Sequence, residues 1–451
     1  MPDEICIVTA GSVDSGKSSF VGVMMGGELD DGNGLARKKV SKHPHEISSG
    51  KTSDIAVHTI KGTQEKEITI VDLCGHEKYL GTTLFGMTGY FPDYGILIVA
   101  ANRGLLKMTR EHFGILLYLK IPFLIVVTRI DITPRDLYEK TINSIKILIK
   151  KCNKNPVLIN SVSDFYLSDT EKIEREKISE LDGIKYCEMV KENPSIVPII
   201  SISNKTGYYI NTMKTMLSSL KPRNVWNSDE SGSIFYIDSK FSPIGVGTVA
   251  SGILKGNTIK VDDELLIGPY GKEFLPIRVR SIHDNNKINI NELKDRHRGC
   301  LAFRVLDKKI DFTKNMIRKG NVIVSKGFEK NICYEFKAKI EILHHSTTIS
   351  SKYSPVIHCG TVRQTARIKL LSPEQILKVG DEAIVSFRFI SHPEFIEPGM
   401  RFFFREGTTR GTGSVEEIIP ITEDPDQNPA EPKKRKNRRR SFRRKINKND
   451  K

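Results

Sequence analysis

Apolar residues in the first half of the chain fall into two kinds of segment. Short continuous apolar runs predict buried strands at residues 5–10, 68–71, 123–127 and 196–200. Helical segments are predicted between them at residues 18–25, 111–118 and 138–151, and residues 169–181 form a charged run that we also interpret as helical. Strands that alternate with helices are typical of a sheet covered by helices. We therefore predict an α/β domain over residues 3–222, with a helical surface region between residues 131 and 203.

The pattern changes after residue 222. Residues 233–324 and 334–419 consist of short runs in which apolar and polar residues alternate, broken by Gly, Asn and paired Asp. Such runs predict strands joined by tight turns, as in β-barrels. We predict one barrel at residues 228–328 and a second at residues 333–420.

The positive charge of the chain is concentrated at its C-terminal end. The formal net charge is +16, and residues 433–451 contain twelve Lys or Arg against one acidic residue. A polar segment with several prolines precedes them. Because such a sequence cannot bury a core, residues 421–451 are predicted to be a disordered basic tail. Attraction to phosphate backbones is the favoured role of this tail, with a solubility tail or a nuclear import signal at residues 433–436 as alternatives.

Composition bounds the class of protein. A chain of 451 residues exceeds one ordinary core and suggests two to four domains. No run of 18 apolar residues occurs, and the first residues lack the pattern of a signal peptide. Seven scattered cysteines without a Cys-x-x-Cys pair argue against a disulfide framework and against a zinc site. We expect a cytoplasmic monomer without membrane contact, for which the basic tail leaves nuclear entry open.

A glycine-rich loop follows the first predicted strand directly. Two glycines allow its backbone N–H groups to point at a polyphosphate, which the next helix N-terminus also favours. Lys17 has the length to reach the β- and γ-phosphates, and the Ser18 hydroxyl suits a Mg²⁺ shell. A chance glycine-rich turn is the alternative, but the flanking strand and helix favour a nucleoside triphosphate site. The predicted phosphate loop comprises Gly11, Ser12, Val13, Asp14, Ser15, Gly16, Lys17 and Ser18.

A second loop follows the strand at residues 68–71. It consists of Asp72, Leu73, Cys74, Gly75 and His76. Asp72 is placed to hold Mg²⁺ through water, and the Gly75 N–H to sense the γ-phosphate. His76 is placed to orient the attacking water, so His76 and Lys17 are the predicted catalytic residues. The alternatives are a turn or helix-cap role for Asp72, a solvated surface position for His76 and simple packing for Cys74.

A third loop predicts the base. It consists of Thr128, Arg129, Ile130 and Asp131. A carboxylate at Asp131 accepts hydrogen bonds from N1–H and the 2-amino group of guanine, whereas N1 of adenine is itself an acceptor. Arg129 is suited to lie over the base face. Backbone amides at Ser203 and Asn204, after the fourth strand, are predicted to complete the pocket; the alternative for Asp131 is a helix cap.

These loops, in this order, resemble the translational GTPases of the elongation factor Tu type. Within that group, residues 45–53 and the base motif beginning with Thr are most similar to the GTP-binding protein 1 subfamily. The similarity spans residues 3–420 and implies that GTP/GDP and Mg²⁺ are the ligands. It also implies that Thr52 is a switch residue that ligates Mg²⁺ in the GTP state. No fourth globular domain is expected, which argues against a selenocysteine-specific factor.

Three positions depart from the pattern of elongation factor Tu. Thr128 replaces the usual Asn and loses an amide that ties the base loop to the phosphate loop, and Arg129 replaces Lys. Lys51 stands where that factor has an apolar residue that pairs with the position of Val13 to gate the catalytic His. Intrinsic hydrolysis is therefore expected to be slow or differently controlled.

The resemblance implies a GTP-hydrolysing switch that delivers tRNA or a related ligand to the ribosome. No arginine finger is recognisable, so activation by a large partner is expected. Ribosome rescue or an RNA-decay adaptor role is the close alternative. A GTP-stabilised binding module with little hydrolysis and a metabolic GTP-dependent enzyme subunit are further alternatives. Arg405 and Arg410 are candidate RNA contacts from the third-domain resemblance, or ordinary surface arginines.

Overall fold

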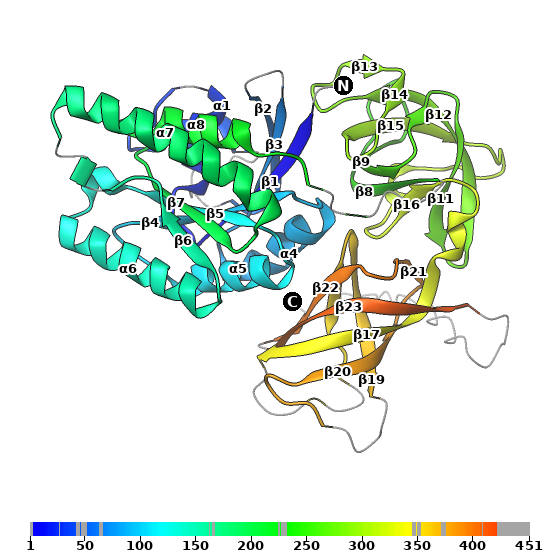
Figure 1. The fold of residues 1–451 in the computed structure, drawn as a ribbon. Helices are drawn as coiled ribbons and strands as arrows, with labels where there is room; N and C mark the ends of the chain where they lie inside the picture. The colour runs from blue at the N-terminus through cyan, green and yellow to red at the C-terminus, as the bar shows by residue number, and fades with distance from the viewer. Residues whose placement is uncertain are drawn as a thin grey trace, which may run out of the picture.

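The computed structural model contains the three predicted domains (Figure 1). It describes residues 3–26, 28–41, 46, 52–62, 66–161, 163–164, 167–223, 226, 232–344, 349, 353–370, 376–407 and 409–421. An α/β domain is followed by two all-β domains, which confirms the predicted fold class. The prediction of a disordered tail at residues 421–451 falls, apart from residue 421, outside the described part of the chain.

The α/β domain is built on one sheet of mainly parallel strands. Its strands are β1 (Glu4–Ala10), β2 (Ala56–Lys61), β3 (Glu67–Asp72), β4 (Tyr94–Ala100), β5 (Phe123–Thr128), β6 (Asn155–Leu158) and β7 (Ile196–Ser201). They lie in the order β2-β3-β1-β4-β5-β7-β6, and β2 alone among them runs antiparallel to its neighbour. The four strands expected from apolar runs are thus β1, β3, β5 and β7. β4 (YGILIVA) has the same apolar character as these four.

Helices cover both faces of this sheet. They are α1 (Lys17–Gly26), α2 (Leu35–Val40), α4 (Leu80–Gly89), α5 (Lys107–Tyr118), α6 (Arg135–Lys151), α7 (Asp169–Glu192) and α8 (Ile210–Ser219). Side chains of β1 alternate between two cores: Val8 packs with α4, α5 and α6, and Ile7 packs with α1, α7 and α8. α7 runs further than the predicted segment 169–181, and its start is fixed by a capping box between Ser168 and Glu171.

The parallel strands place all the predicted loops at one edge of the sheet. The phosphate loop follows β1, the Asp72 loop follows β3, the Thr128 loop follows β5 and the Ser203 loop follows β7. β1 lies between β3 and β4, so the chain reverses its direction across the sheet there. In open α/β sheets, ligands bind at such a switch point beyond the carboxyl ends of the strands.

The two β domains are closed barrels. The first contains β8 (Ser233–Phe241), β9 (Val249–Gly256), β11 (Glu264–Tyr270), β12 (Glu273–His283), β15 (Arg298–Val305) and β16 (Val322–Val324), with the short β10 (Ile259–Lys260), β13 (Asn289–Ile290) and β14 (Glu292–Leu293). The second contains β17 (Ile332–His344), β18 (Val356–Cys359), β19 (Val362–Leu370), β20 (Glu382–Phe389), β22 (Arg401–Glu406) and β23 (Thr409–Pro420), with the short β21 (Glu394–Phe395). Pairing of β11 with β12 closes the first barrel, and pairing of β17 with β20 closes the second.

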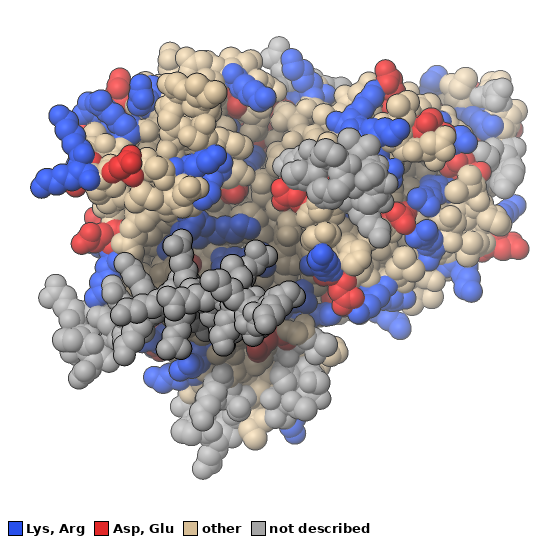
Figure 2. Space-filling model, turned by 180° about the vertical axis from the view of Figure 1, so that it is seen from behind, with Lys and Arg blue, Asp and Glu red and all other residues tan. Residues whose placement is uncertain are grey.

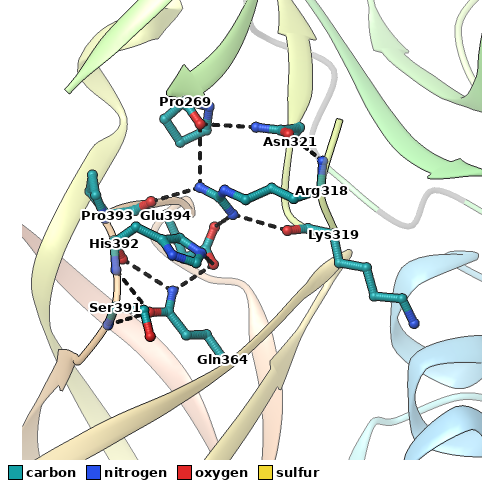
Figure 3. A network of polar contacts seen from close by, with 9 residues as sticks. All are labelled: Pro269, Arg318, Lys319, Asn321, Gln364, Ser391, His392, Pro393 and Glu394. Atoms are coloured by element: carbon teal, nitrogen blue, oxygen red, sulfur yellow. Dashed lines mark hydrogen bonds and ion pairs between the residues drawn. The ribbon is translucent and has the colours of Figure 1, made fainter. Parts of the chain in front are cut away.

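The two barrels are joined by a buried network of charged and polar side chains (Figure 3). The Glu394 side chain is only 1% exposed and accepts hydrogen bonds from Arg318 at 2.6 Å and from Gln364 at 2.6 Å. Arg318 comes from the first barrel, whereas Gln364 and Glu394 belong to the second. A second buried pair, Lys255 and Glu397 at 2.9 Å, also crosses this joint. Strands of both barrels share a small apolar cluster there, so the barrels form one packed unit.

Polar contacts also join the α/β domain to both barrels. The Arg298 backbone N–H donates to Glu4 on β1 at 3.0 Å, and its guanidinium donates to the Tyr90 carbonyl at 3.2 Å. Arg410 of β23 pairs with Glu111 of α5. Seen from behind, acidic and basic side chains are interspersed over the body of the molecule (Figure 2). Within the described residues, no helix combines the length and apolarity needed to cross a bilayer.

Candidate nucleotide site

The phosphate loop has the backbone that its glycines predict. Gly11 and Gly16 adopt φ values of 138° and 88°, and α1 begins at Lys17. The Lys17 ammonium is buried and donates to the carbonyls of Gly11 at 3.2 Å and Ser12 at 2.8 Å. Burial lowers the pKa of Lys17, against an opposing effect of Asp72. The loop therefore encloses the Lys17 ammonium group at the position where the sequence predicts the β- and γ-phosphates of the nucleotide.

Side chains from neighbouring elements hold this loop. The Gly11 N–H donates to Nδ1 of His112 on α5 at 2.9 Å. The Thr128 hydroxyl donates to the Ser15 carbonyl at 2.8 Å. The expectation that Thr128 loses the tie between base loop and phosphate loop is thus wrong, because its hydroxyl makes that tie in place of an amide.

Three oxygen-bearing side chains predicted to hold Mg²⁺ lie together. The Ser18 hydroxyl donates to Asp72 Oδ2 at 2.7 Å and lies 3.0 Å from the Thr52 hydroxyl. The Thr9 hydroxyl donates to the other Asp72 oxygen at 2.7 Å and so fixes the carboxylate. Hard oxygen ligands of this kind suit Mg²⁺, which usually keeps several waters besides one or two protein ligands. The residues present therefore fit the ion, and the contact with Ser18 brings Thr52 against the phosphate loop.

The Asp72 loop packs closely on the phosphate loop. A Cβ atom at Gly75 would lie 2.5 Å from Lys17 Nζ and 2.7 Å from the Val13 nitrogen, so only glycine fits there. His76 is part-buried, and its Nδ1 accepts a hydrogen bond from the Lys78 N–H at 3.1 Å. Cys74 is fully buried, and burial raises the pKa of its thiol to about 12. These observations agree with the packing interpretation of Cys74.

The base loop and the Ser203 loop meet at Asp131. The Ser203 hydroxyl donates to Asp131 Oδ1 at 2.8 Å and also accepts from the Thr206 N–H at 3.1 Å. Arg129 has a positive φ of 63°. It lines the same pocket as Lys17 and Ser18 of the phosphate loop. Asn204 lies beside the phosphate loop, since its Nδ2 is 3.7 Å from a Cβ built at Gly16.

The nucleotide loops enclose a small pocket of about 70 Å³. It is lined by Val13, Asp14, Gly16, Lys17, Ser18, Ser19, Arg37, Thr52, Gly75, His76 and Arg129. A larger cavity of about 630 Å³ lies where the three domains meet and contains none of the predicted nucleotide residues. The smaller pocket is the candidate site, because Lys17 and Gly75 approach each other across it.

Several residues that were predicted to bind ligands contact other parts of the protein. Leu73 and Ile130 are buried in the core beneath α4 and α5. Arg410 pairs with Glu111, and Arg405 donates to the Gly407 carbonyl at 3.4 Å. The gate prediction rests on Lys51, which lies outside the described residues. Two residues of the site carried no sequence signal: His112 sits in an ordinary amphipathic helix, and Arg37 sits in a short basic one.

Two buried histidines, His112 and His358, make the stability of the fold depend on pH. Burial, together with the charge of Lys17, lowers the pKa of this imidazole to about 3, and burial lowers that of His358 to about 3 as well. Below pH 6.5 the two histidines bind protons in the unfolded chain, whereas in the folded protein they stay neutral. Acid therefore lowers the free energy of unfolding. We expect each histidine to cost about 2 kcal/mol between pH 6.5 and pH 5. Urea unfolding of His112→Gln should show a weaker loss on acidification than wild type, and an unchanged loss would contradict the assignment.

The sequence matches known families over most of its length. Residues 3–223 match the elongation factor Tu GTP binding domain, and residues 329–419 match the elongation factor Tu C-terminal domain. GTP-binding protein 1 of Xenopus laevis is 37% identical over 446 residues, which cover 93% of this chain and 64% of that protein. GTP-binding protein 2 of Homo sapiens is 35% identical over 448 residues, which cover 93% of this chain and 70% of that protein. The chain thus spans about two thirds of the length of these relatives.

Solved structures with a similar fold include two elongation factors. Bacterial selenocysteine-specific elongation factor EF-Sec has a TM-score of 0.65 at 19% identity, covering 94% of this chain and 60% of that chain. Elongation factor SelB from Methanococcus maripaludis, in complex with the GTP analogue GppNHp, has a TM-score of 0.64 at 21% identity, covering 93% and 81%. At this identity the likeness shows the fold alone. Taken with the two domain matches and the 35–37% identical relatives, the chain belongs to the elongation factor Tu family of GTPases and groups with GTP-binding proteins 1 and 2.

Proposed function

We propose that this protein is a GTP-driven switch that delivers tRNA or a related RNA ligand to the ribosome. The observation that carries the proposal is the contact of the Thr52 hydroxyl with the hydroxyl of Ser18, which itself donates to Asp72. This contact joins the proposed switch segment to the phosphate loop. A switch of this kind needs its mobile segment to depend on the nucleotide and the metal. Mg²⁺, held by Ser18, Thr52 and Asp72, would neutralise charge on the phosphates.

The side chains of the pocket fit water-mediated hydrolysis. His76 Nδ1 accepts the Lys78 N–H, so in the neutral imidazole the proton lies on Nε2. A ring with this tautomer donates a hydrogen bond to a water and positions it, rather than taking its proton. Lys17 supplies positive charge to the β- and γ-phosphates once they replace its carbonyl partners. His76 and Lys17 are therefore proposed as the catalytic pair.

The barrels support the carrier part of the proposal. Arg410 binds Glu111 on α5, and Arg363 lies beside Gly81 at the start of α4. α4 follows the His76 loop directly. A change at the γ-phosphate thus reaches the second barrel through α4. Because the two barrels pack as a unit, the whole barrel pair is expected to shift against the α/β domain when GTP is hydrolysed.

The decisive test is GTP hydrolysis with and without purified ribosomes. We expect ribosomes to stimulate the wild-type protein and His76→Ala to lose at least 10²-fold of the stimulated rate, the usual contribution of a positioned proton-transfer or water-orienting group. His344→Ala, an exposed histidine of the second barrel, is the matched control and should behave as wild type. Tight GTP binding without ribosomal stimulation would refute the ribosomal role and favour an RNA-decay adaptor or a GTP-stabilised binding module.

A further inference from the structure

The short helix α2 carries an arginine into the nucleotide pocket. Arg37 lines this pocket together with Ser18, Thr52 and His76. Its side chain is part-buried, and among the described residues its Nε has no hydrogen-bond partner although the atom is shielded from solvent. A buried donor without an acceptor costs free energy. A pocket that keeps such a donor is arranged for an acceptor that arrives with the ligand.

The support beneath Arg37 is rigid. α2 packs so closely on α1 that a Cβ at Gly22 would lie 2.1 Å from the Ala36 carbonyl oxygen. The Ala36 N–H donates to Asp30 Oδ1 at 3.0 Å, and both Ala36 and Val40 are buried in the core with α1. The backbone that carries Arg37 is therefore held by packing, and the Arg37 guanidinium lies close to Gly34.

The charges around the pocket define the ligand chemistry. Among its described lining residues, Lys17, Arg37 and Arg129 are basic, and Asp14 is acidic. Asp14 already has a cationic partner, Arg103, at 3.5 Å. The pocket is thus arranged for a polyanion, and the planar fork of arginine matches pairs of phosphate oxygens.

We propose that the Arg37 guanidinium binds phosphate oxygens of GTP and supplies, from within this chain, charge that stabilises the triphosphate during hydrolysis. The inference rests on this pocket being the GTP site, as argued above. α2 lies between the phosphate loop and Thr52 in the sequence, so the same contact couples α2 to the bound nucleotide. Sequence motifs mark no such arginine, because it enters from a helix outside the three loops.

Neutralising Arg37 tests this role directly. Arg37→Met keeps the length of the side chain and removes its charge and donors. We expect a 10- to 100-fold loss of affinity for GTP or of the single-turnover hydrolysis rate without ribosomes, the range of a charge-assisted hydrogen bond to phosphate. Lys38→Met removes the same charge from an exposed position of the same helix and should match wild type. Arg37→Lys, which keeps the charge and loses the fork, should fall between the two.

Titrations with fluorescent GTP and GDP locate the contact. A loss for GTP alone places the guanidinium on the γ-phosphate, whereas a loss for both nucleotides places it on the α- or β-phosphate; both support the proposal. Circular dichroism and thermal unfolding of each variant separate this loss from misfolding. Affinities and rates for Arg37→Met within twofold of Lys38→Met would overturn it. Because none of these measurements uses ribosomes, failure of the ribosomal role leaves the test intact.

Discussion

Replacement of Asp131 by asparagine is expected to weaken GTP binding by about 10³-fold or more and to create affinity for xanthosine triphosphate. In the proposed base contact, the Asp131 carboxylate accepts hydrogen bonds from N1–H and the 2-amino group of guanine. Ser203 donates to Asp131 Oδ1 at 2.8 Å, so an asparagine keeps its oxygen toward Ser203 and turns its NH₂ group toward the base. That NH₂ group opposes the donors of guanine and pairs with the 2-oxo group of xanthine.

Fluorescence titration with both nucleotides measures this exchange of specificity. Asp136→Asn is the matched control, since Asp136 is exposed in the first turn of α6 a few residues further on. It should leave both affinities unchanged. If Asp131→Asn also leaves GTP affinity unchanged, Asp131 does not read the base; nor does it cap α6, whose N-cap is Pro134 without a side-chain hydrogen bond.

The second large effect concerns stability. The Arg298 side chain is 4% exposed and pairs with Asp238, which is 2% exposed. Arg298→Met leaves the Asp238 carboxylate buried without its partner. We expect the free energy of unfolding to fall by about 3–5 kcal/mol, the usual cost of breaking one side of a buried pair. The loss falls where the first barrel meets β1, because Arg298 also contacts Glu4 and Tyr90.

Urea unfolding of the full chain tests this value against an exposed pair of the same kind. Arg278 and Glu264 lie 2.5 Å apart on the first barrel with side chains 39% and 44% exposed. Arg278→Met should leave the free energy of unfolding close to that of wild type, because exposed ion pairs contribute little to stability. The double variant Arg298→Met/Asp238→Leu should regain most of the lost stability, because apolar residues often replace a buried ion pair at little cost. Equal losses for Arg298→Met and Arg278→Met would refute the role of burial.

Local patterns predicted the α/β domain and its loops well. The apolar runs became β1, β3, β5 and β7, since parallel strands buried on both faces leave a continuous apolar signal. The glycines of the phosphate loop required positive φ values, which the structure has. Ser18 and Asp72 were assigned to one ion from motif order alone, and they lie 2.7 Å apart.

Residues that act across long sequence distances escaped this reasoning. His112 reaches the phosphate loop from 101 residues away, and its helix has an ordinary amphipathic pattern. Arg298 and Glu4 are charged residues in strand-like runs, where a local pattern places charges on the surface. The sequence shows that Thr128 lacks the amide of the usual Asn, but it does not show that the Thr128 hydroxyl lies close enough to donate to the Ser15 carbonyl. Such contacts are fixed only by tertiary packing.

The joint between the barrels bears on how chimeric proteins of this family can be assembled. Glu394 takes its partners from both barrels, whereas Glu397 of the second barrel bonds to Lys255 and Tyr236 of the first. A graft that exchanges one barrel for that of a relative brings in a foreign surface against two buried carboxylates. The viable cassette is therefore residues 232–421 as a whole, and its natural cut site lies before Ser233, where β8 begins.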